Sequence, residues 1–353
     1  MRWSLFFGDN MSNKRIYLLF VCLVSTLGGF LFGYDTAVIS GTLAFVRTQF
    51  NMNALLEGWF VGSALLGCIA GVSFTGFITD FFGRKKALLL SAVFLAVSAI
   101  GCMLAKSLTA LIGYRLLGGV GVGIASMLSP LYISEISPPL IRGRMVSLYQ
   151  FAITLGILSA YFANAKILSF GQTVSADSGL WTWVLSSEVW RGMFGAEIVP
   201  AVLFFLLLFF VPESPRWLMA KNKRDRAKEV LLKFVSKEAA AKEVDDIQQV
   251  LSEETGDWRQ LFRPGIRLAM FIGISLAVLS QLTGINAIIY YGPKIFEIAG
   301  FTTGGSLGSQ VIIGVINVLF TLIAIWKIDH LGRRVLLMAG CTGMLISHLL
   351  IGV

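Results

Sequence analysis

Long apolar segments recur along this chain and limit the folds open to it. A helix of about 20 apolar residues is long enough to cross the hydrocarbon core of a bilayer. Charged residues make up 14% of the chain, where soluble domains carry roughly 25%. The chain is therefore predicted to be an all-α integral membrane protein. Its nine predicted crossings lie near 16-40, 59-79, 87-105, 110-134, 145-168, 193-211, 267-290, 307-327 and 335-353.

The basic residues, which give a net charge of +9, gather in alternate loops rather than on one soluble face. This pattern reports membrane topology, and no nucleic-acid partner is expected. Cationic loops stay in the cytoplasm, so the N-terminus and the long loop at 212-266 are predicted to lie inside a multi-pass protein of the plasma membrane. The loops concerned hold Lys14 and Arg15, then Arg84, Lys85 and Lys86, then Arg142 and Arg144, then the 216-242 run, and finally Arg333 and Arg334.

A six-residue pattern occurs twice, each time in a tight loop between two apolar segments. The first copy is Asp80-Phe-Phe-Gly83-Arg84-Lys85 and the second is Asp329-His-Leu-Gly332-Arg333-Arg334. This spacing is expected if a six-helix unit is duplicated. It predicts an N-terminal six-helix bundle at 14-211, a cytoplasmic linker with short helices at 212-266, and a partial bundle of three helices at 267-353.

Two further motifs join the repeated loops: Arg142-Gly143-Arg144 after the fourth segment, and Pro212-Glu-Ser-Pro-Arg-Trp-Leu218 after the sixth. Together these motifs resemble the signatures of the sugar-porter branch of the major facilitator superfamily, from about residue 14 to the end. The resemblance implies two six-helix bundles around a central cavity, a protein that works as a monomer by alternating access, and a location in the bacterial inner membrane.

Three of the helices that this architecture needs have no counterpart in the sequence. In the family, the tenth and eleventh helices contribute a Trp and further polar contacts to the sugar. The chain is therefore expected to be truncated to about nine helices, with poor stability and little transport if it ends at Val353. A sugar sensor or an inactive product is the alternative from another functional class.

Burial of an ionisable side chain in a membrane costs free energy, so such residues within the predicted segments are functional candidates. Asp35 is interpreted as a proton site, and the alternative is a static ion pair with Arg115. Glu197 is open between proton coupling and a structural role. The resemblance favours proton symport over passive facilitation, because proton-coupled sugar porters typically have Asp at this position and passive facilitators have Asn.

The seventh segment carries side chains suited to a neutral sugar, which needs hydrogen-bonding groups and aromatic faces. Helical geometry puts Asn286 and Tyr290 on one face, and Gly284 lets the helix bend. Interhelical hydrogen bonding is the alternative for each amide. The resemblance assigns sugar contacts to Phe32, Gln150, Gln281, Asn286, Tyr291 and Asn317, and Ser280 stands where the family commonly has a second Gln.

A cytoplasmic latch is predicted from the motif loops, in which an acidic residue at a helix end can hold a basic residue across the loop. Simple helix capping is the alternative for Glu135. The residues assigned to gating are Asp80, Gly83, Arg84, Glu135, Arg142, Glu213, Arg216, Asp329 and Arg333.

Other chemistry has little support in the sequence. The four cysteines are interpreted as packing residues, and neither His330 nor His348 has the spacing of a metal ligand. No cofactor, metal or enzymatic activity is expected. The prediction is a monosaccharide:proton symporter, with a passive facilitator as the second choice and with the sugar, the proton and the lipid bilayer as partners.

Overall fold

Helices form along every predicted apolar segment. The computed structural model describes residues 11–171, 183–253 and 265–352, without the side chains at 11, 12, 329, 351 and 352. The elements are α2 (Met11–Gln49), α3 (Ala54–Phe82), α4 (Arg84–Leu104), α5 (Leu108–Ile136), α6 (Arg142–Gly171), η1 (Trp183–Ser187), α8 (Val189–Gly195), α9 (Ile198–Leu208), α10 (Pro215–Ala220), α11 (Arg224–Leu232), α12 (Lys237–Glu253), α13 (Ile266–Leu282), α14 (Ile285–Ile298), α15 (Thr303–Leu331) and α16 (Arg333–Gly352).

Eight helical stretches of the described residues are long and apolar enough to cross a membrane, and α16 covers the ninth predicted segment. The all-helical fold is therefore confirmed. The first helix is longer than predicted, from 11 to 49 rather than from 16 to 40. The added stretch after residue 40 includes Leu43 and Val46, which are buried in the bundle, and packing of this kind extends a helix beyond its most hydrophobic segment.

Two of the predicted crossings are broken helices. The sixth consists of α8 and α9, with Glu197 at the junction as the residue before α9. The seventh consists of α13 and α14, which meet at Thr283 and Gly284. Gly284 has the left-handed backbone conformation (φ 80°) that favours glycine. The predicted bend at Gly284 is thus a complete interruption of the helix.

The two copies of the repeated loop have the same backbone conformation. Gly83 between α3 and α4 has φ 93° and ψ 168°, and Gly332 between α15 and α16 has φ 78° and ψ 156°. Each glycine donates its N–H to a carbonyl four residues earlier, Thr79 or Ile328. A side chain would strain both positions, so the glycines are what allow two long helices to join through a single residue.

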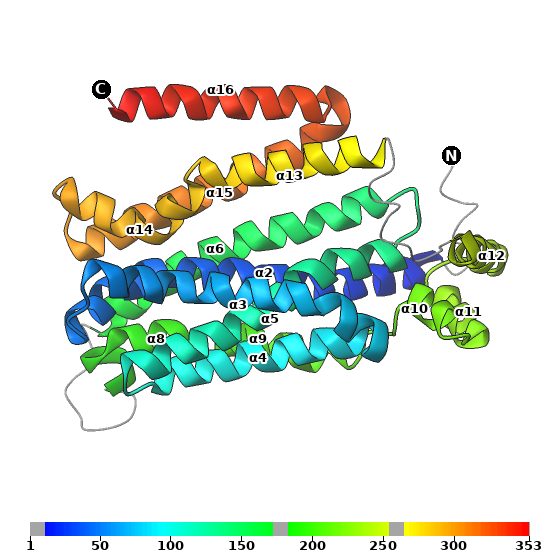
Figure 1. Ribbon diagram of the computed structural model, residues 1–353, viewed down its shortest axis with the longest axis horizontal. Helices are drawn as coiled ribbons and strands as arrows, with labels where there is room; N and C mark the ends of the chain where they lie inside the picture. The colour runs from blue at the N-terminus through cyan, green and yellow to red at the C-terminus, as the bar shows by residue number, and fades with distance from the viewer. Residues whose placement is uncertain (1–10, 172–182, 254–264, 353) are drawn as a thin grey trace.

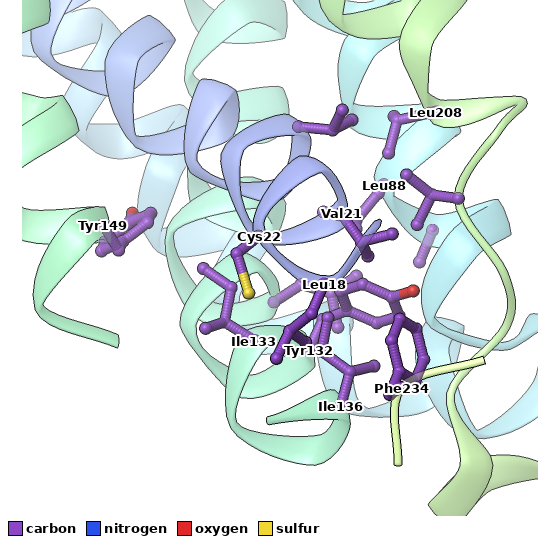
Figure 2. Packing of buried hydrophobic residues seen from close by; sticks show 14 of the residues in the cluster. Leu18, Val21, Cys22, Leu88, Tyr132, Ile133, Ile136, Tyr149, Leu208 and Phe234 are labelled. Carbon is purple, nitrogen blue, oxygen red and sulfur yellow. The ribbon is translucent and has the colours of Figure 1, made fainter. Parts of the chain in front are cut away.

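The helices pack side by side, with α2 mainly against α6 and α5, while α10, α11 and α12 lie together at one end (Figure 1). The core near that end joins α2 to α5. Figure 2 shows Leu18 and Cys22 of α2 beside Ile133 and Ile136 of α5. Phe234, which follows α11, is fully buried in the same cluster and so attaches the short helices to the bundle.

Glycines bring pairs of helices into backbone contact. A Cβ added at Gly67 of α3 would lie 2.1 Å from the Leu116 carbonyl oxygen of α5. A Cβ added at Gly33 of α2 would lie 2.0 Å from the Ile153 carbonyl oxygen of α6. Small residues at such crossings are typical of helix packing in membranes.

The α3–α5 crossing makes a prediction about stability. Gly67→Ala should separate the two backbones and destabilise the protein by about 1–3 kcal/mol. Gly62→Ala on the same helix is the matched control, because nothing lies within 4 Å of a Cβ there. Thermal melting in detergent should show a lower midpoint for Gly67→Ala alone, and equal midpoints for the two variants would contradict the close crossing.

The C-terminal helices α13 to α16 pack more loosely than α2 to α9. No residue of α13 is buried. Contact with the N-terminal helices comes mainly through α14, against α2, and α15, against α6. Exposure of the apolar surfaces of α13 and α16 to water is unfavourable, so these surfaces need contact with lipid or protein.

Candidate functional site

A cavity of about 620 Å³ lies between the N-terminal helices α2, α3, α5 and α6 and the C-terminal helices α13, α14 and α15. This volume suits a small organic molecule. The polar residues of its wall come from both sides. They are Asp35, Thr36, Arg115, Gln150 and Thr154 from the N-terminal helices, and Gln281, Asn286, Tyr290, Asn317 and Thr321 from the C-terminal helices.

Most of the side chains predicted to contact sugar meet at this cavity. Its wall includes Phe32, Gln150, Gln281, Asn286 and Asn317. Their role as sugar contacts stays a prediction.

Tyr291 is placed differently from the other predicted sugar contacts. It is absent from the cavity wall, whereas its neighbour Tyr290 lines it. Tyr291 is half-buried, and the Lys294 ammonium lies 5.8 Å from the centre of its ring. Ideal helical geometry had already put Tyr290 on the face of Asn286, whereas the choice of Tyr291 came from the resemblance.

The break between α13 and α14 brings two amides together. Asn286 Nδ2 donates a hydrogen bond to Gln281 Oε1 at 2.7 Å. This bond uses one lone pair of Gln281 Oε1 and one of the two N–H groups of Asn286. The Gln281 N–H groups and the Asn286 carbonyl oxygen suit a sugar hydroxyl, which both accepts and donates hydrogen bonds.

A buried charge pair opens onto the same cavity. Arg115 Nη1 lies 3.7 Å from Asp35 Oδ1, and the two side chains are 2% and 8% exposed. The guanidinium lies 5.6 Å from the ring centres of both Phe60 and Phe194. Within the described residues, Arg115 Nε and Nη1 have no hydrogen-bond partner. The pair is therefore in ionic contact at 3.7 Å without a hydrogen bond between Nη1 and Oδ1.

Glu197 belongs to this charge cluster but not to the cavity wall. Its side chain is buried at the junction of α8 and α9 and interacts electrostatically with Asp35 and Arg115. Two buried carboxylates thus interact electrostatically with one guanidinium, and Asp35 is the one in ion-pair contact with it. When both carboxylates are ionised, the three groups carry one net negative charge, which one bound proton would neutralise.

The predicted latch residues of the first loop meet beside α10. Arg84 donates to both oxygens of Glu135, with Nη2–Oε1 at 3.0 Å and Nε–Oε2 at 3.1 Å. Glu213 Oε1 accepts the backbone N–H groups of Arg84 and Lys85, at 2.8 and 3.1 Å. A Cβ at Gly83 would meet Glu213 Oε2 at 2.4 Å, so this glycine leaves room for the carboxylate.

Two opposing effects act on the pKa of the Glu213 carboxyl group. Burial raises the pKa of its carboxyl group, while N–H bonds from Ser214, Lys85 and Arg84 and the charge of Arg84 oppose the rise. The Ser214 hydroxyl also donates to Glu135. Sequence reasoning missed Ser214, although its place between Glu213 and Pro215 at the start of α10 marks it as a helix cap.

The other predicted gating residues lie farther from this core. Asp80 Oδ1 is 3.9 Å from Arg84 Nη1, and Arg216 lines a surface pocket together with Glu135. Arg142 lies 3.9 Å from Glu243 of α12 and lines the same surface pocket as Glu135. In the second loop, Arg333 is exposed, and the Asp329 side chain lies outside the described part of the chain.

No group of three or more His, Cys, Asp or Glu side chains that could hold a metal occurs among the described residues. The cavity instead offers amides, hydroxyls, aromatic rings and one buried ion pair. Such a wall suits the binding of a polar, uncharged molecule and the movement of a proton.

Comparison with known proteins places the chain in a family. A family model described as sugar (and other) transporter matches residues 21–353. The arabinose-proton symporter of Bacillus subtilis (strain 168) is 40% identical over 342 residues, which cover 97% of this chain and 72% of that protein. The D-xylose-proton symporter of Escherichia coli (strain K12) is 40% identical over 372 residues, covering 97% and 73%. The chain belongs to the sugar transporter family.

Solved structures agree with this family membership. The proton:xylose symporter XylE of the major facilitator superfamily, bound to 6-bromo-6-deoxy-D-glucose, matches with a TM-score of 0.80 and 38% identity. The match covers 91% of this chain and 71% of that one. A partially occluded inward-open structure of XylE from E. coli matches with a TM-score of 0.77, 37% identity, and coverage of 90% and 74%. The resemblance stated from the loop motifs is confirmed.

Proposed function

We propose that this protein is a monosaccharide:proton symporter that works by alternating access. The observation that carries the proposal is the buried Asp35–Arg115 pair on the wall of a cavity lined with amides. A sugar bound there would contact helices from both sides of the cavity, α6 through Gln150 and α13 through Gln281. Movement of one set of helices against the other would then expose the sugar to alternate faces of the membrane.

The names of the relatives support this choice. Proteins of similar sequence are described as proton symporters of arabinose, xylose and galactose. We infer from the charge cluster that Asp35 takes up the transported proton, with Arg115 and Glu197 changing its surroundings as the helices move. A passive facilitator remains the second candidate, since the sugar contacts alone would serve it equally well.

The wider arrangement follows from the same proposal. Residues 14-211 form the N-terminal bundle, 212-266 the linker and 267-353 helices of the C-terminal bundle. The positive loops put the N-terminus and α10 to α12 in the cytoplasm of a bacterial cell, so that α14 ends near the outside. The protein acts as a monomer in the bilayer and performs transport rather than catalysis, without cofactor, metal or nucleic acid.

Uptake into proteoliposomes tests the function. Vesicles with an imposed inward proton gradient should accumulate labelled sugar above its external concentration, and unlabelled xylose, arabinose, galactose, glucose and inositol should be compared as competitors. Accumulation that a protonophore abolishes supports symport. Equilibration that is indifferent to the gradient would identify a facilitator. Binding without uptake would favour a sensor.

A further inference from the structure

The end of α14 that lies away from α10 to α12 is tied to the N-terminal helices by charge (Figure 1). Lys294 Nζ of α14 lies 3.1 Å from Glu57 Oε1 of α3. Arg47 Nε, near the end of α2, lies 3.5 Å from Glu57 Oε2. The Glu57 side chain is only 7% exposed. One nearly buried carboxylate therefore holds a cation from each side of the cavity.

A second contact follows from Pro293, the residue before Lys294. Proline has no N–H, so the Ile289 carbonyl lacks the partner that an uninterrupted helix would supply. The Tyr161 hydroxyl of α6 and Gln310 Nε2 of α15 each lie 3.4 Å from this oxygen. Gly292 makes room for Gln310, because a Cβ there would lie 2.1 Å from Gln310 Oε1. Pro293 thus creates an acceptor that binds α14 to α6.

Tyr290 connects these contacts to the central cavity. It lines that cavity and also a second, smaller cavity of about 70 Å³. The wall of the smaller cavity includes Arg47, Glu57 and Lys294. The segment of α14 from Tyr290 to Lys294 therefore separates the central cavity from the charge network.

We infer that Arg47, Glu57 and Lys294 form an ionic lock that keeps α14 closed over the central cavity on its outer side. The inference rests on the proposed alternating access. Lys294 shares a helix with Asn286 and Tyr290, so release of the lock lets the helix that contacts sugar swing away from α2 and α3. Loss of Glu57 or Lys294 removes the attraction that opposes opening. The hydrogen bond from Tyr161 to the Ile289 carbonyl positions α14 against α6 when the cavity is closed.

Cys68 provides a reporter for this lock. It lines the central cavity and is half-buried, whereas Cys22 and Cys102 are buried. In a Cys341→Ser background, a membrane-impermeant methanethiosulfonate added outside intact cells should label Cys68 slowly. Lys294→Gln and Glu57→Gln should each raise the labelling rate on the order of 5- to 30-fold, as expected for one broken partly buried interaction.

A double-mutant cycle separates the lock from general loosening. The double variant Glu57→Gln/Lys294→Gln should label no faster than Glu57→Gln alone, because loss of Glu57 already removes the pairing with Lys294 as well as that with Arg47. Lys294→Arg should leave the rate near that of wild type. The exposed pair Arg224–Asp245, whose Nη2–Oδ1 distance is 2.7 Å, is the matched control, and Asp245→Asn should have no effect.

Unchanged labelling in both single variants, additive effects in the double variant, or a rise seen only with reagent on the cytoplasmic side would overturn the lock. The readout needs neither sugar nor a proton gradient, so a protein that fails to transport can still be tested. Conversely, proton-driven uptake with no change in Cys68 labelling would leave the proposed function intact and remove the lock.

Discussion

Arg115→Leu is expected to abolish sugar accumulation and to destabilise the protein strongly. The substitution leaves Asp35 buried without its ion-pair partner, and it leaves Glu197 buried without the nearby positive charge of Arg115. Removal of one partner from a buried ion pair costs about 3–5 kcal/mol, because the remaining charge is uncompensated. Loss of contact with Phe60 and Phe194 adds to this cost. Thermal melting in detergent and uptake in proteoliposomes measure the two effects.

Two controls make the Arg115 result specific. Lys106→Leu also removes one positive charge, from an exposed position, and should change neither melting nor accumulation. Arg115→Lys keeps the charge but loses the planar group near two rings. This variant should fold normally but should transport sugar poorly. Wild-type accumulation by Arg115→Leu would show that the charge cluster has no part in coupling.

Gln281→Ala is expected to raise the sugar concentration for half-maximal uptake about 10-fold or more. The substitution removes an amide from the cavity wall and also removes the acceptor of the Asn286 hydrogen bond. A binding site that loses one hydrogen-bonding group and leaves another unpaired loses about 1–3 kcal/mol. Initial rates of labelled sugar uptake, measured over a range of concentrations, test this expectation.

The neighbouring Ser280 supplies the matched control for Gln281. Its hydroxyl donates to the Ala277 carbonyl of its own helix at 2.8 Å, and Ser280 does not belong to the cavity wall. Ser280→Ala should therefore leave half-maximal uptake unchanged. If Gln281→Ala, like Ser280→Ala, left the half-maximal sugar concentration unchanged, Gln281 would not be a sugar contact.

The apolar segments were enough to predict the helices, and the repeated loops with the motifs at 142–144 and 212–218 were enough to predict the family. The length of an apolar run reports a crossing directly, and Gly83 and Gly332 adopt the same turn because the same local sequence precedes and follows them. Helix breaks were harder to predict. A glycine such as Gly284 allows either a bend or an interruption, and packing decides between them.

The contact between Glu57 and Lys294 was beyond prediction from the sequence. Glu57 and Lys294 are 237 residues apart, and neither lies in a motif that marks it. The tyrosine at the cavity shows a different difficulty. Tyr290 and Tyr291 are adjacent and chemically identical, and helical geometry puts Tyr290 on the face of Asn286 whereas the resemblance points to Tyr291.

The residues of the charge cluster could be predicted one by one from their chemistry. Asp35, Arg115 and Glu197 were selected because ionisable groups at membrane depth need a reason to be there, and the structure brings all three together. The spacing of Glu197 left its role open between proton coupling and structure, because its distance from Asp35 and Arg115 depends on the break between α8 and α9.

The most direct test of proton coupling follows the external pH of lightly buffered cells while the transported sugar is added. Wild-type protein should make the medium more alkaline as sugar and protons enter together. Asp35→Asn, which keeps the shape of the side chain but cannot take up a proton, should still exchange labelled sugar across the membrane and should produce no alkalinisation. Sugar-induced alkalinisation of undiminished size in Asp35→Asn would contradict the assignment of Asp35 as the coupling site.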